Sequence, residues 1–177
     1  ITAQSAGNFV INKATPTVTL AVNNSPVTYD ATAKSATVAQ SGASTPGAVA
    51  NILTGGAADQ TTAGTYAVTA NFVPTDTTNY NTITAQSAGN FVIDKANQTA
   101  VTLAGPASAT FLTTPTLTIG GGSGTGAVTF DVGASTGCTV SGNTLTVVSV
   151  SGTCDVTATK AADTNYNVAS SAATAVT

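Results

Sequence analysis

Residues 66–72 read Tyr-Ala-Val-Thr-Ala-Asn-Phe, a run in which side chains for burial alternate with small or polar ones. Successive side chains of a β-strand point to opposite faces of its sheet, so this alternation predicts a strand with one buried face. The expected buried face carries Tyr66, Val68, Ala70 and Phe72. The opposite face carries Ala67, Thr69 and Asn71. The run therefore predicts a half-buried strand of an antiparallel sheet.

Shorter runs of the same kind occur on both sides of this strand. One spans residues 17–22, and the later ones contain the apolar sets Leu117 and Ile119, Val128 and Phe130, Leu145 and Val147, and Cys154, Val156 and Ala158. Glycine-containing turns separate the runs, at residues 55–56, 120–122, 141–143 and 151–152. Short strands at this spacing, without helical periodicity, predict an all-β fold of antiparallel β-sandwiches with seven strands each.

A nearly exact internal repeat sets the domain organisation. Residues 1–14, ITAQSAGNFVINKA, recur as residues 83–96, ITAQSAGNFVIDKA, and differ only at Asn12 and Asp94. Repetition at a fixed period of tens of residues is typical of tandem arrays. The repeat predicts two modules, at residues 14–95 and 96–177. Residues 1–13 are either the last strand of a preceding module or the first strand of the first module, and the start without Met suggests a piece of a longer chain.

Three segments of the first module resemble a known family of bacterial repeats. They are residues 29–34 (Tyr-Asp-Ala-Thr-Ala-Lys), 64–70 (Gly-Thr-Tyr-Ala-Val-Thr-Ala) and 91–96 (Phe-Val-Ile-Asp-Lys-Ala), and together they resemble the MBG-type bacterial immunoglobulin-like repeat. Residues 152–160, followed by 162–167, are similar to a related bacterial immunoglobulin-like module. The resemblance implies two tandem immunoglobulin-like sandwiches from a long secreted surface adhesin. It supplies no functional residues.

The composition argues against several classes of function. Charged residues make up 6% of the chain, with four lysines, seven aspartates, and no Arg, Glu or His. Phosphate binding needs clustered basic residues, so nucleic acid is not an expected partner. No apolar run is long enough to predict a membrane-spanning helix. Without His and Glu the usual nucleophile–base pairs cannot be built, and the chain is not expected to be an enzyme.

The two cysteines, Cys138 and Cys154, lie in strand-like sequence without a histidine or a third cysteine nearby. They predict a disulfide, with free buried thiols as the alternative, and a disulfide indicates an oxidising, extracellular or cell-surface setting. A Lys–Asn isopeptide bond is an alternative covalent link, with Lys13, Lys34 and Lys95 as candidates. An exposed lysine at a strand edge is the simpler interpretation.

A polar motif recurs near the end of both modules, as Asp-Thr-Thr-Asn-Tyr-Asn at residues 76–81 and Asp-Thr-Asn-Tyr-Asn at residues 163–167. Its oxygen-bearing side chains are candidate ligands for calcium or an inter-module site: Asp76, Asn79, Asn81, Asp163, Asn165 and Asn167. One carboxylate per motif is few, so the favoured interpretation is structural: Asx turns, with the hydroxyls of Tyr80 and Tyr166 bonded to backbone at the edge of the core. The glycine run 120–126 precedes a strand and not a helix, which predicts a hairpin loop and not a phosphate site.

These features predict a structural segment that extends or assembles a long bacterial surface protein, with neighbouring repeats of the same chain as partners. Two alternatives stay open. One is an adhesin module that binds a glycan, a protein or a host surface through its end loops. The other is a filament subunit that self-associates when residues 1–13 complete the sheet of a neighbour.

Overall fold

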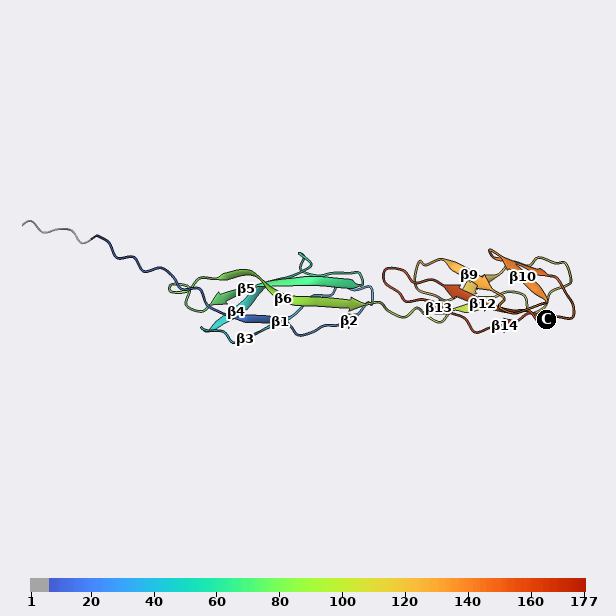
Figure 1. The fold of residues 1–177 in the computed structure, drawn as a ribbon, viewed down its shortest axis with the longest axis horizontal. Coiled ribbons are helices and arrows are strands. Elements are labelled where there is room, and N and C mark those ends of the chain that lie inside the picture. The colour runs from blue at the N-terminus through green and yellow to red at the C-terminus, as the bar shows by residue number, and fades with distance from the viewer. Residues whose placement is uncertain (1–6) are drawn as a thin grey trace, which may run out of the picture. The chain divides into compact units, whose positions relative to one another are not determined.

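A computed structural model describes residues 7–177, and these residues form antiparallel β-sheets without a helix. The chain divides into two compact units (Figure 1). Unit 1 comprises Ile1–Val27 and Ala31–Ile93, and unit 2 comprises Thr28–Asp30 and Asp94–Thr177. The boundary at Ile93 and Asp94 lies within two residues of the predicted one between residues 95 and 96, and Thr28–Asp30 are grouped with unit 2 although the repeat predicts them in the first module.

Unit 1 is built from one larger sheet and one strand pair. Its strands are β1 Thr19–Val22, β2 Val27–Thr28, β3 Val38–Ser41, β4 Gly47–Thr54, β5 Gly64–Pro74 and β6 Ile83–Asp94. The larger sheet has the order β2-β6-β5-β4, and β1 pairs with β3. Strands β5 and β6 are antiparallel and paired along most of their length, from Phe72 opposite Ile83 to Gly64 opposite Ile93. The second copy of the repeated sequence is therefore an interior strand of this sheet.

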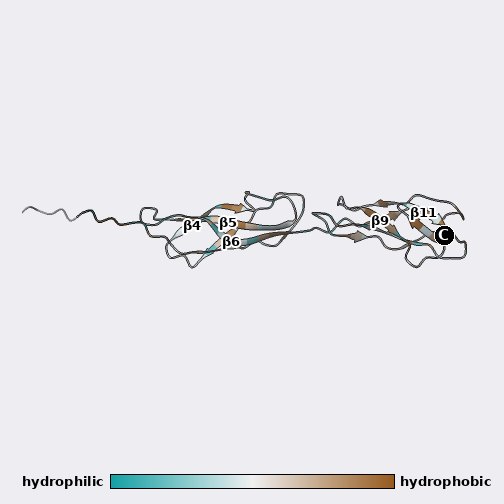
Figure 2. Ribbon diagram, turned by 45° about the horizontal axis from the view of Figure 1, so that its top comes forward, coloured by the Kyte–Doolittle hydropathy of each residue, from teal (hydrophilic) through white to brown (hydrophobic). Residues whose placement is uncertain are grey.

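The core of unit 1 contains the face of β5 that the alternation predicts. Val68, Ala70 and Phe72 are fully buried, while Tyr66 at the start of the strand is half-buried. The neighbouring strand β6 adds Phe91 and Ile93, which are 0% and 2% exposed. Figure 2 shows hydrophobic residues along β5, as this packing requires. The predicted strand and its buried face are confirmed.

Unit 2 distributes its strands over three small sheets. They are β7 Thr102–Ala104, β8 Thr118–Gly120, β9 Val128–Asp131, β10 Cys138–Ser141, β11 Thr144–Val147, β12 Asp155–Lys160, β13 Ala169–Ser170 and β14 Thr174–Ala175. Strand β12 pairs with β9, β13 and β14, while β7 pairs with β8 and β10 with β11. The core cluster consists of Leu117, Cys138, Leu145, Cys154, Val156 and Val176. A small core with a disulfide inside it holds these short strands together.

Three sequence predictions need correction here. The described residues form six strands in unit 1 and eight in unit 2, not seven in each. The glycine run at residues 120–126 is not a hairpin loop, since β8 pairs with β7 and β9 pairs with β12. It crosses from one sheet to another. Val128 was expected to point inward and is 38% exposed.

The first copy of the repeated sequence does not form a strand in the part that the structure describes. Residues 1–6 lie outside the described residues, and residues 7–13 have no strand structure. Phe9 and Ile11 are 90% and 84% exposed. The prediction that this segment is the first strand of the first module is wrong for residues 7–13. The corresponding place in the sheet, between β2 and β5, is already filled by β6.

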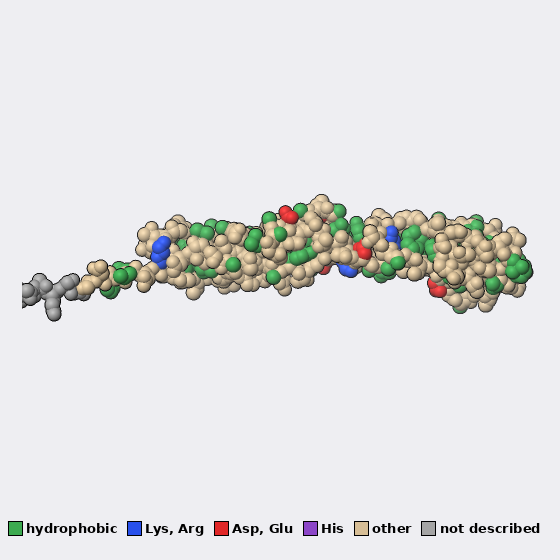
Figure 3. Space-filling view, turned by 90° about the horizontal axis from the view of Figure 1, so that it is seen from above, with side chains coloured by type: hydrophobic (Ala, Val, Ile, Leu, Met, Phe, Trp, Pro, Cys, Tyr) green, Lys and Arg blue, Asp and Glu red, His purple; other side chains and the backbone are tan. Residues whose placement is uncertain are grey.

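Charged side chains are sparse on the surface. Figure 3 shows isolated lysines and aspartates separated by hydrophobic and uncharged polar side chains. Within residues 7–177, no helix is long and apolar enough to cross a membrane.

Candidate functional site

Each unit holds its own first residues against a polar loop late in the same unit. We call this arrangement the entry clasp: residues 13–15 on residues 76–81 in unit 1, and residues 95–97 on residues 163–167 in unit 2. In both units the backbone of an alanine makes a parallel bridge to a tyrosine, Ala14 to Tyr80 and Ala96 to Tyr166. The recurring Asn-Tyr-Asn, at residues 79–81 and 165–167, is thus one half of the clasp, and the recurring Lys-Ala is the other.

In unit 1, the clasp is a set of backbone and side-chain hydrogen bonds around Ala14. The Ala14 amide donates to the carbonyl of Asn79 at 2.9 Å, and the Asn81 amide donates to the carbonyl of Ala14 at 2.8 Å. The Asn81 side-chain amide donates to the Lys13 carbonyl at 3.4 Å. Lys13 Nζ donates to the carbonyl of Thr77 at 2.6 Å. Lys13 and Ala14 are therefore docked to the unit and not a free linker.

Unit 2 repeats these bonds residue by residue. The Ala96 amide donates to the Asn165 carbonyl, and the Asn167 amide donates to the Ala96 carbonyl, both at 2.9 Å. The Asn167 side-chain amide donates to the Lys95 carbonyl at 3.5 Å. Lys95 Nζ donates to the Asp163 carbonyl at 2.5 Å. Lys95 and Ala96 are likewise docked to their own unit.

The Asp163 carboxylate organises the loop of unit 2. Its Oδ1 accepts from the amides of Asn165 and Tyr166, both at 2.8 Å. Its Oδ2 accepts from the amide and the hydroxyl of Thr125, at 2.6 and 3.1 Å. These donors, with the Thr125 amide first, lower the pKa of Asp163 to about 2, because each favours the ionised form. Asp163 therefore ties the glycine-rich crossing of unit 2 to its clasp.

Asp76 also organises the loop of unit 1, through hydrogen bonds from residues of that loop alone. Its Oδ1 accepts from the amides of Thr78 and Asn79, at 3.0 and 3.1 Å, and its Oδ2 accepts from Asn79 Nδ2 at 2.8 Å. The hydrogen bonds from the Asn79 side chain and backbone lower the pKa of Asp76 below its usual value. Both aspartates thus form the Asx turns that the sequence predicts.

The hydrogen bonds of the motif bear directly on the calcium hypothesis. Both oxygens of each aspartate already accept from N–H or O–H donors, which a cation would have to displace. The side-chain amides of Asn81 and Asn167 turn their N–H groups toward the entry segment. The described residues contain no group of three or more His, Cys, Asp or Glu side chains arranged for a metal. The motif's geometry is that of a loop closed by hydrogen bonds.

The pKa of Asp163 makes a testable prediction about acid stability. A carboxylate whose pKa is lowered on folding stabilises the fold above its unfolded pKa and loses that contribution as the pH falls through the folded value. We expect the thermal midpoint of unit 2 to fall between about pH 4 and about pH 2, the window between the ordinary Asp pKa and that of Asp163. Asp163→Asn should weaken this acid dependence. Asp131→Asn, the same change at an exposed site in β9, should retain it, and equal acid dependence in the two variants would contradict the role of Asp163.

The tyrosine hydroxyls do not follow the sequence prediction. Among the described residues, neither Tyr80 nor Tyr166 has a hydroxyl hydrogen bond; their backbones carry the bridges, and the ring of Tyr166 meets Tyr29 edge-on at 5.4 Å. It is Tyr66 whose hydroxyl bonds back to the chain, donating to the Thr62 carbonyl at 2.8 Å. The signal was present in the sequence, since Tyr66 opens a strand and its partner lies four residues upstream.

The disulfide Cys138–Cys154 is confirmed, and both residues are buried in the core of unit 2. It joins the first residue of β10 to the residue preceding β12. Of the isopeptide candidates, Lys13 and Lys95 each donate a hydrogen bond from Nζ to a backbone carbonyl, of Thr77 and Asp163. Lys34 pairs through its backbone with Gln60.

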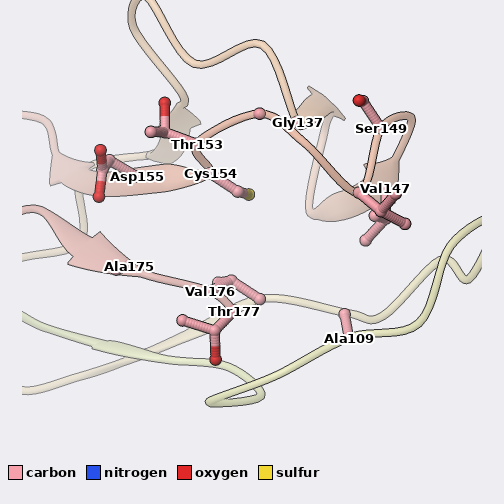
Figure 4. Close-up of a pocket in the computed structure, with 12 residues that line it drawn as sticks. Ala109, Gly137, Val147, Ser149, Thr153, Cys154, Asp155, Ala175, Val176 and Thr177 are labelled. Carbon is pink, nitrogen blue, oxygen red and sulfur yellow. The ribbon is translucent and has the colours of Figure 1, made fainter.

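A cavity of about 530 Å³ lies beside the disulfide in unit 2 (Figure 4). It is bounded by Cys154, by the loop containing Ser149 and by Val176 and Thr177, and its lining is mostly apolar. Asp155 is the single carboxylate among the lining residues. A lone carboxylate without a second acid–base group offers no catalytic pair. The mostly apolar lining makes the cavity a candidate site for a small apolar group.

The chain matches no protein-family model, and no curated protein or solved structure is significantly similar to it.

Proposed function

We propose that the chain is a structural segment of a long extracellular protein of a bacterial surface, in which each unit is an immunoglobulin-like β-sandwich of the MBG-type class. The observation that carries the proposal is the entry clasp, which recurs with equivalent residues and bonds in both units. A device that docks the start of a unit onto its own late loop makes the unit self-contained. Self-contained units are what a chain needs in order to grow by repetition.

The sequence at the unit boundary supports the same proposal. Strand β6 ends at Asp94, and Ala96, two residues later, already belongs to the clasp of unit 2. Nearly the same sequence leads into both clasps: Phe-Val-Ile-Asn-Lys-Ala at residues 9–14 and Phe-Val-Ile-Asp-Lys-Ala at residues 91–96. One strand-to-clasp transition therefore serves as a joint that repetition can copy.

The covalent chemistry and the surface favour an extracellular setting. A disulfide persists in oxidising compartments and is rare in reducing ones. A surface with few charges and many hydroxyl and amide groups is consistent with contact with water or polysaccharide.

Repeated extension can be tested with chains that carry one, two or three copies of residues 14–95 followed by residues 96–177. We expect the maximum dimension from small-angle X-ray scattering to grow by an equal increment per copy, while the unfolding midpoint stays constant. A dimension that stops growing, because added copies fold back on one another, would contradict the proposal.

The adhesin alternative is tested on the intact chain. Labelled protein is offered to glycans, polymers and cell surfaces, with and without calcium. A structural segment gives no saturable binding. Saturable binding that is lost in Tyr80→Ala or Tyr166→Ala would favour an adhesive module, with the late loops as its site.

The exposed first copy of the repeat favours strand exchange as a second candidate function. Phe9 and Ile11 are almost fully exposed, whereas Phe91 and Ile93, in the same sequence, are buried in β6. Residues 7–11 therefore carry the side chains of an interior strand and could occupy the β6 place in a sheet that lacks its own. Sedimentation velocity at rising concentration tests this. Association that disappears in the double variant Phe9→Asp, Ile11→Asp would support exchange, and a concentration-independent monomer would count against it.

A further inference from the structure

In unit 1 the first and last segments run side by side in the same direction over the length of the unit. Ala14 is bridged in parallel to Tyr80. Further along, Gln86 Nε2 donates to the Val18 carbonyl at 2.9 Å. The Val92 amide then donates to Ser25 Oγ at 2.8 Å, next to the place where β2 joins β6 in the sheet. Positions rise together on both segments, so the row of bonds is parallel.

Unit 2 has an equivalent row. Ala96 is bridged in parallel to Tyr166, and Gln98 Nε2 donates to the Asn167 carbonyl at 2.8 Å. At the other end, the Ala109 amide donates to the Thr177 carbonyl at 2.9 Å and the Thr177 amide donates to the Ala107 carbonyl at 3.1 Å. The first and last segments of unit 2 are again parallel and bonded at both ends of the row.

This arrangement decides how a pulling force acts on each unit. Tension on a repeat protein enters one unit at its first segment and leaves at its last. When those segments are parallel, the tension slides one along the other, so the hydrogen bonds between them are strained together. If the segments were antiparallel neighbours, the bonds would break one after another.

We propose that each unit is a force-bearing module whose parallel terminal row, from the entry clasp to the end of the last strand, resists extension of the chain. The inference rests on the proposed function, since only an extended tether is put under tension. It adds a mechanical property to that function: resistance of each unit to unfolding under tension. Each hydrogen bond contributes only roughly 1 kcal/mol, but together the few bonds of the row resist extension because they must break at the same time.

The disulfide adds a second property to unit 2. Cys138 and Cys154 are 16 positions apart with their Cα atoms at 5.4 Å, so the chain between them cannot be drawn out while the bond is intact. At about 3.5 Å per extended residue, the intact bond shortens the extension gained on unfolding of unit 2 by roughly 50 Å. Unit 1 contains no cysteine and gives its full length in either redox state.

The test is single-molecule extension of the full chain at constant force, with handles at the two ends. We expect two steps, and the step that lengthens by about 50 Å after reduction identifies unit 2. In a second geometry, one handle stays at the N-terminus and the other is moved from the C-terminus to Thr78. Lys13 contacts Thr77, so the force then pulls the two segments apart at the clasp end of the row. The row then peels, and we expect unit 1 to lose its long dwell time before the step.

A matched pair of substitutions assigns the resistance to the row. Gln86→Ala removes one bond between the terminal segments and should raise the unfolding rate of unit 1 under force about fivefold, the effect of one hydrogen bond. Gln40→Ala removes a bond from Gln40 Nε2 to the Gly47 carbonyl, which does not join the terminal segments, and should leave the rate unchanged. The step of unit 2 should be the same in both variants.

Equal rates for Gln86→Ala and Gln40→Ala, or equal dwell times for the two attachment geometries, would overturn the proposal. Either result would leave repeated extension intact, since that is measured by scattering increments without force. Unequal scattering increments would contradict the proposal of repeated extension. The dwell times of a single chain would still test whether the terminal row resists force.

Discussion

Replacing Phe91 with alanine is expected to destabilise unit 1 by about 3–5 kcal/mol, the usual range for removal of a buried phenylalanine side chain. Phe91 is fully buried in β6, opposite Tyr66 of β5. The empty volume cannot collapse easily, because the sheet is paired on both sides of β6. Urea unfolding should show a lower midpoint for one of the two units only.

The repeat supplies an internal control for this experiment. Phe9→Ala makes the same change in the same local sequence, but Phe9 is 90% exposed. We expect it to change the stability of the monomer by less than about 0.5 kcal/mol, as is usual for exposed sites. A large loss in Phe9→Ala, or a small one in Phe91→Ala, would mean that the two copies exchange places in solution.

The two copies also mark the limit of sequence-based prediction. Residues 7–11 and 89–93 are identical, yet one segment is an interior strand and the other is not a strand at all. A strand needs partners for its backbone groups, and its neighbours in space come from distant parts of the chain. No local pattern in these residues could have distinguished the two outcomes.

The confirmed predictions rest on two local patterns, the alternation of apolar and polar residues and the residue types of turns. The buried face of β5 follows from period-two alternation, and the Asx turns at Asp76 and Asp163 follow from bonds to residues two and three positions on. The entry clasp was missed because it joins Lys13 to Thr77 and Lys95 to Asp163 across most of a unit. The repeated Lys-Ala and Asn-Tyr-Asn can both be read in the sequence, but their pairing cannot.

Gly152 illustrates a second kind of miss. The sequence predicts a turn at residues 151–152, where a glycine usually serves to adopt positive φ, but Gly152 is not among the positive-φ glycines of the described residues. A side-chain carbon there would instead collide with the backbone nitrogen of Gly137. Close approach of two backbones, beside the disulfide, is what requires glycine at this position.

Reducing the disulfide is expected to destabilise unit 2 by about 3 kcal/mol while leaving unit 1 unchanged. The bond closes a loop of about 15 residues, and release of that loop enlarges the conformational freedom of the unfolded chain by this amount. Unit 2 depends on it more than a larger domain would, because its sheets have strands of only two to six residues. Denaturant unfolding with and without dithiothreitol should therefore shift one transition of two.

The double variant Cys138→Ala, Cys154→Ala separates the cross-link from other effects of the reductant. It should reproduce the shift under oxidising conditions, with a further loss from packing, since both side chains are buried against Leu117 and Val156. It should also make unit 2 insensitive to dithiothreitol. Unit 1 provides the reference in the same molecule, because its core of Phe72, Phe91 and Val68 contains no sulfur. If reduction moved both transitions together, the units would unfold as one cooperative body, and the self-contained repeat on which the proposed function rests would have to be abandoned.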